Sequence, residues 1–259
     1  MVYLSDCGGI PSYRGLMSLH HPPATPGSAQ AAGSASSPVV VDERFNGPPR
    51  SANGGYVCGV LAARLGPGPV AVRLFRPLPL GVPLSLDGGR LLDGDTVLAQ
   101  AAPSTDTRPD LPPAVSLPVA DSATTHFAGH LQHPFPTCFG CGTERADGLR
   151  LSPGRIPGTA CVAAPWRPEP VLALEGTVPM PIVWTALDCP GGWAIGGGTV
   201  AVLGTMLGQT FRPVVAGEQL VVTAAPAGAS GRKHHAVSAV WTASGELVAW
   251  SHQTWIEVE

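Results

Sequence analysis

Three residues ahead of an apolar stretch carry the clearest chemical signal in the sequence. Asn53, Gly54 and Gly55 precede "YVCGVLAARL", an apolar run of helical length that a Gly-Pro pair ends. A helix N-terminus presents unpaired backbone N–H groups and a partial positive charge, and two glycines let a ligand carbonyl approach them closely. We therefore expect an oxyanion-binding site here. The alternative is an ordinary N-cap followed by a flexible glycine pair.

A carboxylate stands out in the second half of the chain. Asp188 lies in "PIVWTALDC", an apolar run that predicts a helix over residues 181–189, with the Pro-Gly-Gly of residues 190–192 as its stop. The macrodipole disfavours a negative charge in the last turn of a helix, so another group is expected to compensate. Such a carboxylate could act as a general base or as a nucleophile. The alternative is an exposed helix-end Asp that hydrogen-bonds the turn after it.

A run of histidines and cysteines offers a second pattern. His130, His133, Cys138 and Cys141 form His-x2-His-x4-Cys-x2-Cys, whose ligand types and spacing zinc accepts. A lone Cys-x-x-Cys is a weak signal, however. We favour a tight, packed turn and expect no metal.

The elements that position these residues occur twice. "FRPLPLGVPL" at 75–84 and "FRPVVAGEQL" at 211–220 share Phe-Arg-Pro, three residues, Gly, two residues and Leu. Each copy is followed by a turn signal and a strand-like run, at 93–101 and at 244–252. Because an apolar helical run also stands in each half, the sequence predicts two related units, each with one buried helix and a meander of antiparallel strands.

The unit boundaries follow from composition. Residues 1–38 include a stretch with no charge and no large apolar side chain, which predicts a disordered tail. A first unit spans 39–102 and a second spans 137–259. Between them, residues 103–136 are rich in proline and lack periodicity, which indicates a linker.

Two segments resemble a known family. "HPFPTCFGCGTERADGLRL" at 133–151 resembles the Cys-Phe-x-Cys-Gly and later Gly-Leu segment of hotdog-fold thioesterases, and "NGGYVCGVLAARL" at 53–65 resembles the start of their central helix. The resemblance, to the acyl-CoA thioesterase-like double hotdog family, covers roughly residues 42–259. It implies an α+β fold in which two central helices are each wrapped by a curved antiparallel sheet.

The resemblance also implies an activity, the hydrolysis of an acyl-CoA or acyl-carrier thioester to a free acid and a thiol. In hotdog dimers the site lies between protomers, with oxyanion donors from one helix and the acid from the other. The first unit has the Asn-Gly-Gly start but no acid, and the second has Asp188 but no such start. Fused units would therefore form one composite site, with Gly54 and Gly55 holding the oxyanion, Asn53 orienting the carbonyl or water, and Asp188 as the base. Asn53 stands where His is commoner, and Asn cannot shuttle a proton.

Other residues are candidates for binding substrate. Arg232 and Lys233 form the only basic cluster and could contact the phosphates of coenzyme A, although a solvated turn is the simpler interpretation. Tyr56 and Trp184 are further candidates, from the two helices. The arginines of the two Phe-Arg-Pro copies, Arg76 and Arg212, are expected to be structural.

Composition excludes several classes of protein. A chain of 259 residues with 44% hydrophobic residues can bury a real core, and its net charge of −3 gives no electrostatic footprint for nucleic acid. No stretch approaches the roughly 18 apolar residues of a membrane span, and six cysteines without regular spacing do not match the framework of a small secreted domain. We expect a soluble, cytoplasmic protein without a cofactor.

Two rival functions stay open from sequence alone. A hotdog dehydratase or hydratase would need a His paired with an acid in one cleft, which His234, His235 or His252 could supply in space. A non-catalytic acyl-binding protein would have a filled cleft. The acyl group, the choice between coenzyme A and a carrier protein, and the choice between a monomer of fused units and a homo-oligomer are not readable from the sequence.

Overall fold

The structure is a computed structural model that describes residues 38–196 and 199–258. The predicted disordered tail, residues 1–38, lies outside this part except for its last residue. The helices are α1 (Gly54–Ala62), α2 (Leu117–Thr124) and α3 (Met180–Ala194), with short 3-10 turns η1 (Glu43–Phe45), η2 (Ala128–His130) and η3 (Pro170–Leu172). No helix in the described ranges is long and apolar enough to cross a membrane.

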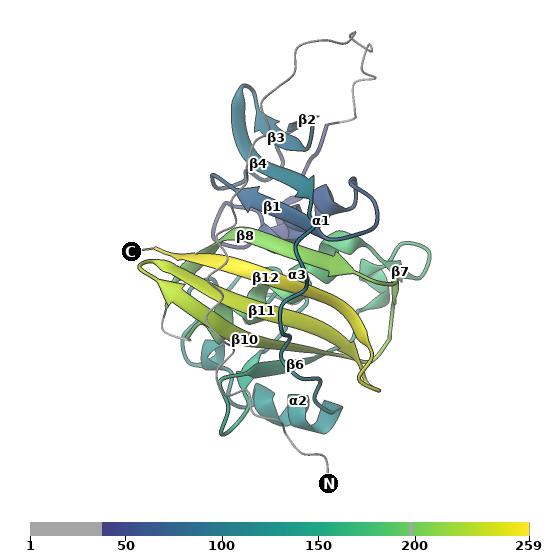
Figure 1. The fold of residues 1–259 in the computed structure, drawn as a ribbon, viewed down its shortest axis with the longest axis vertical. Coiled ribbons are helices and arrows are strands. Elements are labelled where there is room, and N and C mark those ends of the chain that lie inside the picture. The colour runs from purple at the N-terminus through teal and green to yellow at the C-terminus, as the bar shows by residue number, and fades with distance from the viewer. Residues whose placement is uncertain (1–37, 197–198, 259) are drawn as a thin grey trace.

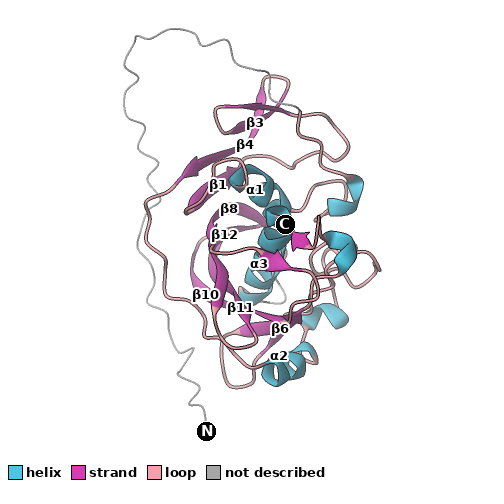
Figure 2. Cartoon of the chain, turned by 90° about the vertical axis from the view of Figure 1, so that its right-hand side faces the viewer, coloured by secondary structure: helices cyan, strands magenta, loops and turns pink. Residues whose placement is uncertain are grey.

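One antiparallel sheet of ten strands dominates the molecule (Figure 1). Its strands are β1 (Val70–Leu74), β2 (Ser85–Asp87), β3 (Arg90–Asp93), β4 (Thr96–Pro103), β5 (Gly154–Arg155), β6 (Val162–Trp166), β8 (Ala201–Thr210), β10 (Leu220–Ser230), β11 (Lys233–Thr242) and β12 (Leu247–Glu257). Their order across the sheet is β2-β3-β4-β1-β8-β12-β11-β10-β6-β5. A separate pair joins β7 (Thr177–Val178) to β9 (Val214–Val215). The sheet curves around α1 and α3, which lie side by side on its inner face (Figure 2).

The two predicted units meet in the middle of this sheet. β1 pairs with β8 in antiparallel fashion, with Val70 opposite Gly208. The repeated segments occupy equivalent places, because the Phe75 N–H donates to the Leu98 carbonyl of β4 and the Phe211 N–H donates to the Val248 carbonyl of β12. Both Phe-Arg-Pro segments begin where β1 and β8 end, since proline cannot donate to a ladder.

The two helices pack closely and antiparallel in the core. Gly55 lies against Asp188, and Gly59, one turn later, lies against Pro181 at the start of α3. A Cβ built on Gly55 would fall 2.4 Å from the Asp188 Cβ, and one on Gly59 would fall 2.5 Å from the Pro181 Cα. Small residues on one face of α1 therefore allow the contact between the units.

Helix α3 runs longer than the sequence predicted. It was expected to end at Cys189, but it continues through Pro190 to Ala194. The sheet contacts the helix just before the proline, where Ser238 Oγ and Gln253 Nε2 both donate to the Leu187 carbonyl, at 2.6 and 2.7 Å. The two glycines after the proline serve close packing against β12, since a Cβ on either one would collide with Gln253 or Trp255.

The segment between the units contains structure that was not predicted. From β4 the chain crosses the outer face of the sheet and reaches α2, which packs against β6 (Figures 1 and 2). The run at residues 148–153 is not a strand. Its Leu149 and Leu151 N–H groups donate instead to the carbonyls of Phe139 and Gly140 in the Cys-x-x-Cys turn. The unit boundaries inferred from composition stay a prediction.

Candidate active site

A cavity of about 450 Å³ lies where the start of α1 meets the middle of α3 and the ends of β1, β8 and β12. Much of its wall is apolar, and the large apolar residues include Leu74, Leu78, Phe135, Trp193, Leu203 and Trp255. Asn53, Gly54 and Asp188 line the same cavity. Three of the four predicted catalytic residues therefore line one cavity, and they come from both units.

Asp188 is held by the other unit's helix. Its Oδ2 accepts a hydrogen bond of 2.9 Å from the Gly55 N–H, in the first turn of α1, while its Oδ1 is buried and has no hydrogen-bond partner. Only 2% of the residue is exposed, so the exposed helix-end alternative is wrong. Burial raises the pKa of this carboxyl to about 7, and the Gly55 hydrogen bond acts in the opposite direction.

The compensation expected for this carboxylate comes from the helix of the other unit. Asp188 lies in the middle of α3 rather than in its last turn. The positive N-terminal end of α1 faces it, so the macrodipole of the neighbouring helix stabilises the charge.

Asn53 and Gly54 form the cavity-facing end of α1. Asn53 is the N-cap, as predicted, because its Oδ1 accepts from the Tyr56 N–H at 2.9 Å. Its Nδ2 points toward the sulfurs of Cys138 and Cys189, at 3.7 and 3.9 Å. Among the described residues no acceptor pairs with the Gly54 N–H. Gly54 therefore offers a backbone donor to a ligand, whereas the Gly55 donor is already used.

The predicted substrate-binding residues do not line the cavity. Tyr56 stacks on Phe45, with ring centroids 4.0 Å apart. Trp184 is only 1% exposed and packs its ring against Gly208 of β8. Neither residue is part of the cavity wall, which the sequence pattern alone did not reveal.

The basic cluster is likewise outside the cavity. Arg232 and Lys233 are exposed at the turn from β10 to β11. Lys233 pairs with Ile256 of β12, which does line the cavity, so the cluster lies one strand away from it.

Two basic side chains at the cavity were missed. Arg76 lines it and is exposed, while its counterpart Arg212 is held by Glu218 and is structural as expected. The two arginines stand in identical Phe-Arg-Pro tripeptides, so the sequence could not show that only one of them lines the cavity. His133 lines the cavity as well, but its Nε2 lies 3.1 Å from the Cys141 carbonyl and its Nδ1 accepts from the Phe135 N–H.

The cysteines of the Cys-x-x-Cys turn meet a third cysteine. Sulfur atoms of Cys138, Cys141 and Cys189 all lie within 4.8 Å of one another, and all three residues are buried. Hydrogen bonds from the Cys141 and Cys189 thiols hold the pKa of Cys138 well below its usual range. The histidines of the predicted pattern are not in this group. His130 is exposed, and its ring contacts the Phe127 ring in a T-shaped arrangement.

Comparison with known proteins establishes the fold. The chain matches no protein family by its sequence pattern and no curated protein. It is similar in structure to a tesB protein of Mycobacterium avium subspecies paratuberculosis, with a TM-score of 0.54 and 15% identity over 82% of this chain and 89% of that one. It is also similar to a conserved protein of unknown function with a hotdog fold from Alicyclobacillus acidocaldarius, with a TM-score of 0.51 and 14% identity over 85% and 91%. The predicted double hotdog is confirmed.

Proposed function

We propose that this double hotdog protein hydrolyses an acyl thioester of coenzyme A, with Asp188 as the general base. One observation carries the proposal. Asp188 lines the same cavity as Gly54, and its Oδ1 is buried without a hydrogen-bond partner. A buried acceptor without a partner is costly, and such groups are typical of sites completed by a ligand or water.

The arrangement suits attack by water on a carbonyl. With the acyl chain among the apolar wall residues, the carbonyl oxygen would accept from the Gly54 N–H at the positive end of α1. One such donor contributes roughly a hundredfold to a thousandfold in rate. In this proposal Gly55 takes a different part from the one expected, because its N–H fixes the carboxylate rather than the oxyanion.

The proton balance needs no further group. Asp188 Oδ1 accepts a proton from water as the water oxygen bonds to the carbonyl carbon. When the tetrahedral intermediate collapses, the C–S bond breaks and the thiolate takes a proton, which regenerates the carboxylate. The products are one free acid and one thiol.

The rival functions have less support. His234, His235 and His252 do not line the cavity, and both ring nitrogens of His133 are engaged within its own turn. Within the described ranges, no free imidazole therefore lies beside Asp188, as a dehydratase would need. A cavity that joins Asn53 to Asp188 also disfavours a protein that has lost its chemistry.

The test is a panel of acyl-CoA substrates of increasing chain length, with released coenzyme A measured by chromatography. Asp188→Asn removes the base but keeps an amide oxygen that can accept from Gly55. We expect kcat/KM to fall by about a hundredfold or more. Asp121→Asn, on the exposed face of α2, is the matched control and should not alter the rate. No hydrolysis across the panel by the wild type, or equal hydrolysis by wild type and Asp188→Asn, would reject the proposal.

A further inference from the structure

We propose that Cys138, Cys141 and Cys189 form a zinc-binding site in the wall of the cavity. Two of these residues come from one turn, and the third comes from the middle of α3. Neither the turn nor the helix alone makes such a site, because a lone Cys-x-x-Cys supplies only two ligands. The fold brings the third.

The sulfur positions match the requirement of the ion. Two thiolates bound at about 2.3 Å to a tetrahedral zinc lie about 3.8 Å apart. The Cys138 and Cys189 sulfurs are 3.7 Å apart, and all three sulfurs lie within 4.8 Å of one another. Small rotations of the side chains would therefore place all three at bonding distance from one ion.

The turn is built to admit the third cysteine. A Cβ on Gly140 would fall 2.4 Å from the Cys189 sulfur, so only glycine lets α3 bring its thiol this close. The Gly142 N–H donates to the Cys138 carbonyl, which closes the turn and directs both of its thiols to the same side. His133 fixes the turn further by its contact of 3.1 Å with the Cys141 carbonyl.

The surroundings suit thiolate ligands. Asn53 Nδ2 lies 3.7 and 3.9 Å from the Cys138 and Cys189 sulfurs and can donate N–H groups to them, as partners of metal ligands commonly do. Phe127 and Trp193 pack around the cysteines. Buried cysteines also occur as small hydrophobes, but that role does not need three converging sulfurs with an amide directed at two of them.

The proposed ion would remain accessible. Three protein ligands leave one position of a tetrahedral zinc, and all three cysteines line the cavity. That position would take water or a soft sulfur ligand such as a thiol. This inference concerns metal binding alone and does not depend on the proposed hydrolysis.

Metal content of the full-length chain tests the site. The protein, purified under reducing conditions, is stripped with a chelator and reloaded with zinc, and bound zinc is then measured by atomic emission. Wild type should hold about one zinc per chain, and Cys138→Ser and Cys189→Ser should each lose most of it. Cys58→Ala removes a buried thiol outside the cluster and should keep the full amount.

Cobalt gives a second measurement that does not rely on variants. Co²⁺ added to the stripped wild type should produce a thiolate-to-cobalt charge-transfer band in the near ultraviolet, and zinc should abolish it. Thermal melting before reloading verifies that each variant is folded. A folded, reduced wild type that retains no zinc and shows no cobalt band would overturn the inference, as would copper or iron in place of zinc. Zinc in a chain without thioesterase activity would uphold this inference and reject the proposed function.

Discussion

The Gly55 N–H donates a hydrogen bond of 2.9 Å to Asp188 Oδ2, and this bond connects the central helices of the two units. It is possible because Gly55 lacks a side chain, so the two helices approach to direct contact. The bond fixes one carboxylate oxygen and leaves the other, Oδ1, buried without a partner in a residue that lines the cavity. The close contact between the two helices at Gly55 therefore also sets the orientation of the Asp188 carboxylate.

A methyl group at Gly55 should disturb both the packing of the two helices and the orientation of Asp188. Gly55→Ala places a Cβ 2.4 Å from the Asp188 Cβ, which we expect to destabilise the fold by about 1–3 kcal/mol and to displace the carboxylate. Gly59→Ala makes a similar collision with Pro181, away from the acid. Urea unfolding should show comparable losses for the two variants, while the rate of hydrolysis should fall much more for Gly55→Ala. Equal rates in the two variants would contradict the positioning role.

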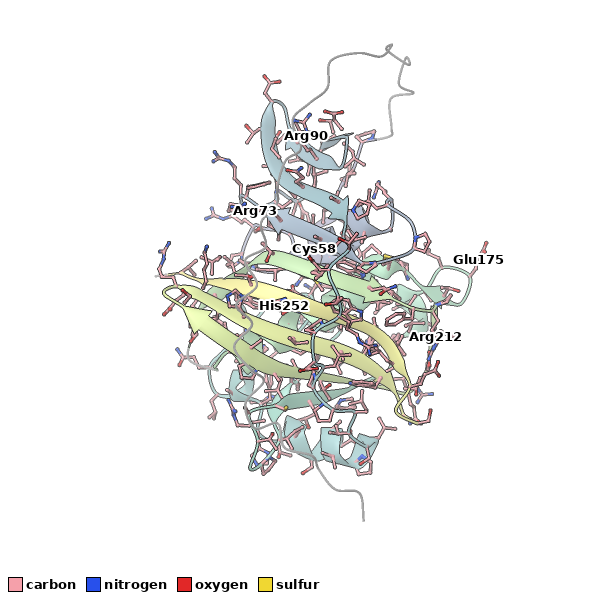
Figure 3. The ribbon with its side chains drawn as sticks, viewed as in Figure 1. Cys58, Arg73, Arg90, Glu175, Arg212 and His252 are labelled. Carbon is pink, nitrogen blue, oxygen red and sulfur yellow. The ribbon has the colours of Figure 1, made fainter. Side chains whose placement is uncertain are left out.

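Arg76 should contribute to binding coenzyme A. It is exposed and is the one arginine or lysine of the described residues that lines the cavity, so it can contact a phosphate. Arg76→Ala should raise KM for an acyl-CoA roughly fivefold, which corresponds to about 1 kcal/mol, and should leave KM for the matching N-acetylcysteamine thioester unchanged. Arg90→Ala, at the far end of the sheet in Figure 3, is the control. A rise for both substrates would indicate a structural effect instead.

Leu203 should limit the size of the acyl group. It lines the cavity and packs against Gly54 at the start of α1. Leu203→Ala should shift kcat/KM roughly tenfold toward longer acyl chains, because one or two methylene groups contribute about 1–3 kcal/mol in an apolar pocket. The same change at Leu91, buried in β3 and outside the cavity, should cost about 2–5 kcal/mol of stability without altering selectivity. If both variants lost stability and both shifted in acyl-chain selectivity, the proposed role of Leu203 in limiting acyl size would be excluded.

Acid should destabilise the protein partly through His252. This residue lies on the outer face of β12 (Figure 3), and burial lowers its pKa to about 4, with His235 acting in the same direction and Asp106 opposing. A histidine in the unfolded chain titrates near about 6.5. Protonation therefore favours the unfolded state, and stability present above that pH is lost as the pH falls toward about 4, by at most about 3 kcal/mol.

Replacement of His252 isolates this contribution. His252→Gln should flatten the dependence of the unfolding free energy on pH between about 6.5 and 4, measured by urea titration at several pH values. His126→Gln, at an exposed position, should leave the curve unchanged. A wild-type curve as flat as that of His252→Gln would contradict the expectation.

The sequence alone determined the features that depend on local interactions. An Asn followed by two glycines and an apolar run predicts a capped helix, because the Asn53 side chain reaches a backbone N–H only three residues away. The repeated Phe-Arg-Pro segments predicted two related units, since each marks the end of an equivalent strand. The resemblance to double hotdog thioesterases, added to these patterns, implied the fold and the pairing of α1 with an acid from the second helix.

The tertiary structure decided which residues from different helices, strands and turns come into contact. It assigned the Gly55 amide to Asp188, brought Cys189 to the Cys-x-x-Cys turn, and carried α3 through Pro190 to Ala194, beside a Leu187 carbonyl that accepts from two sheet side chains. It also separated Arg76, at the cavity, from Arg212, which pairs with Glu218. Each outcome depends on residues far apart in the chain whose contact is set by how closely two helices and one curved sheet can pack. Spacing along the sequence contains no such information.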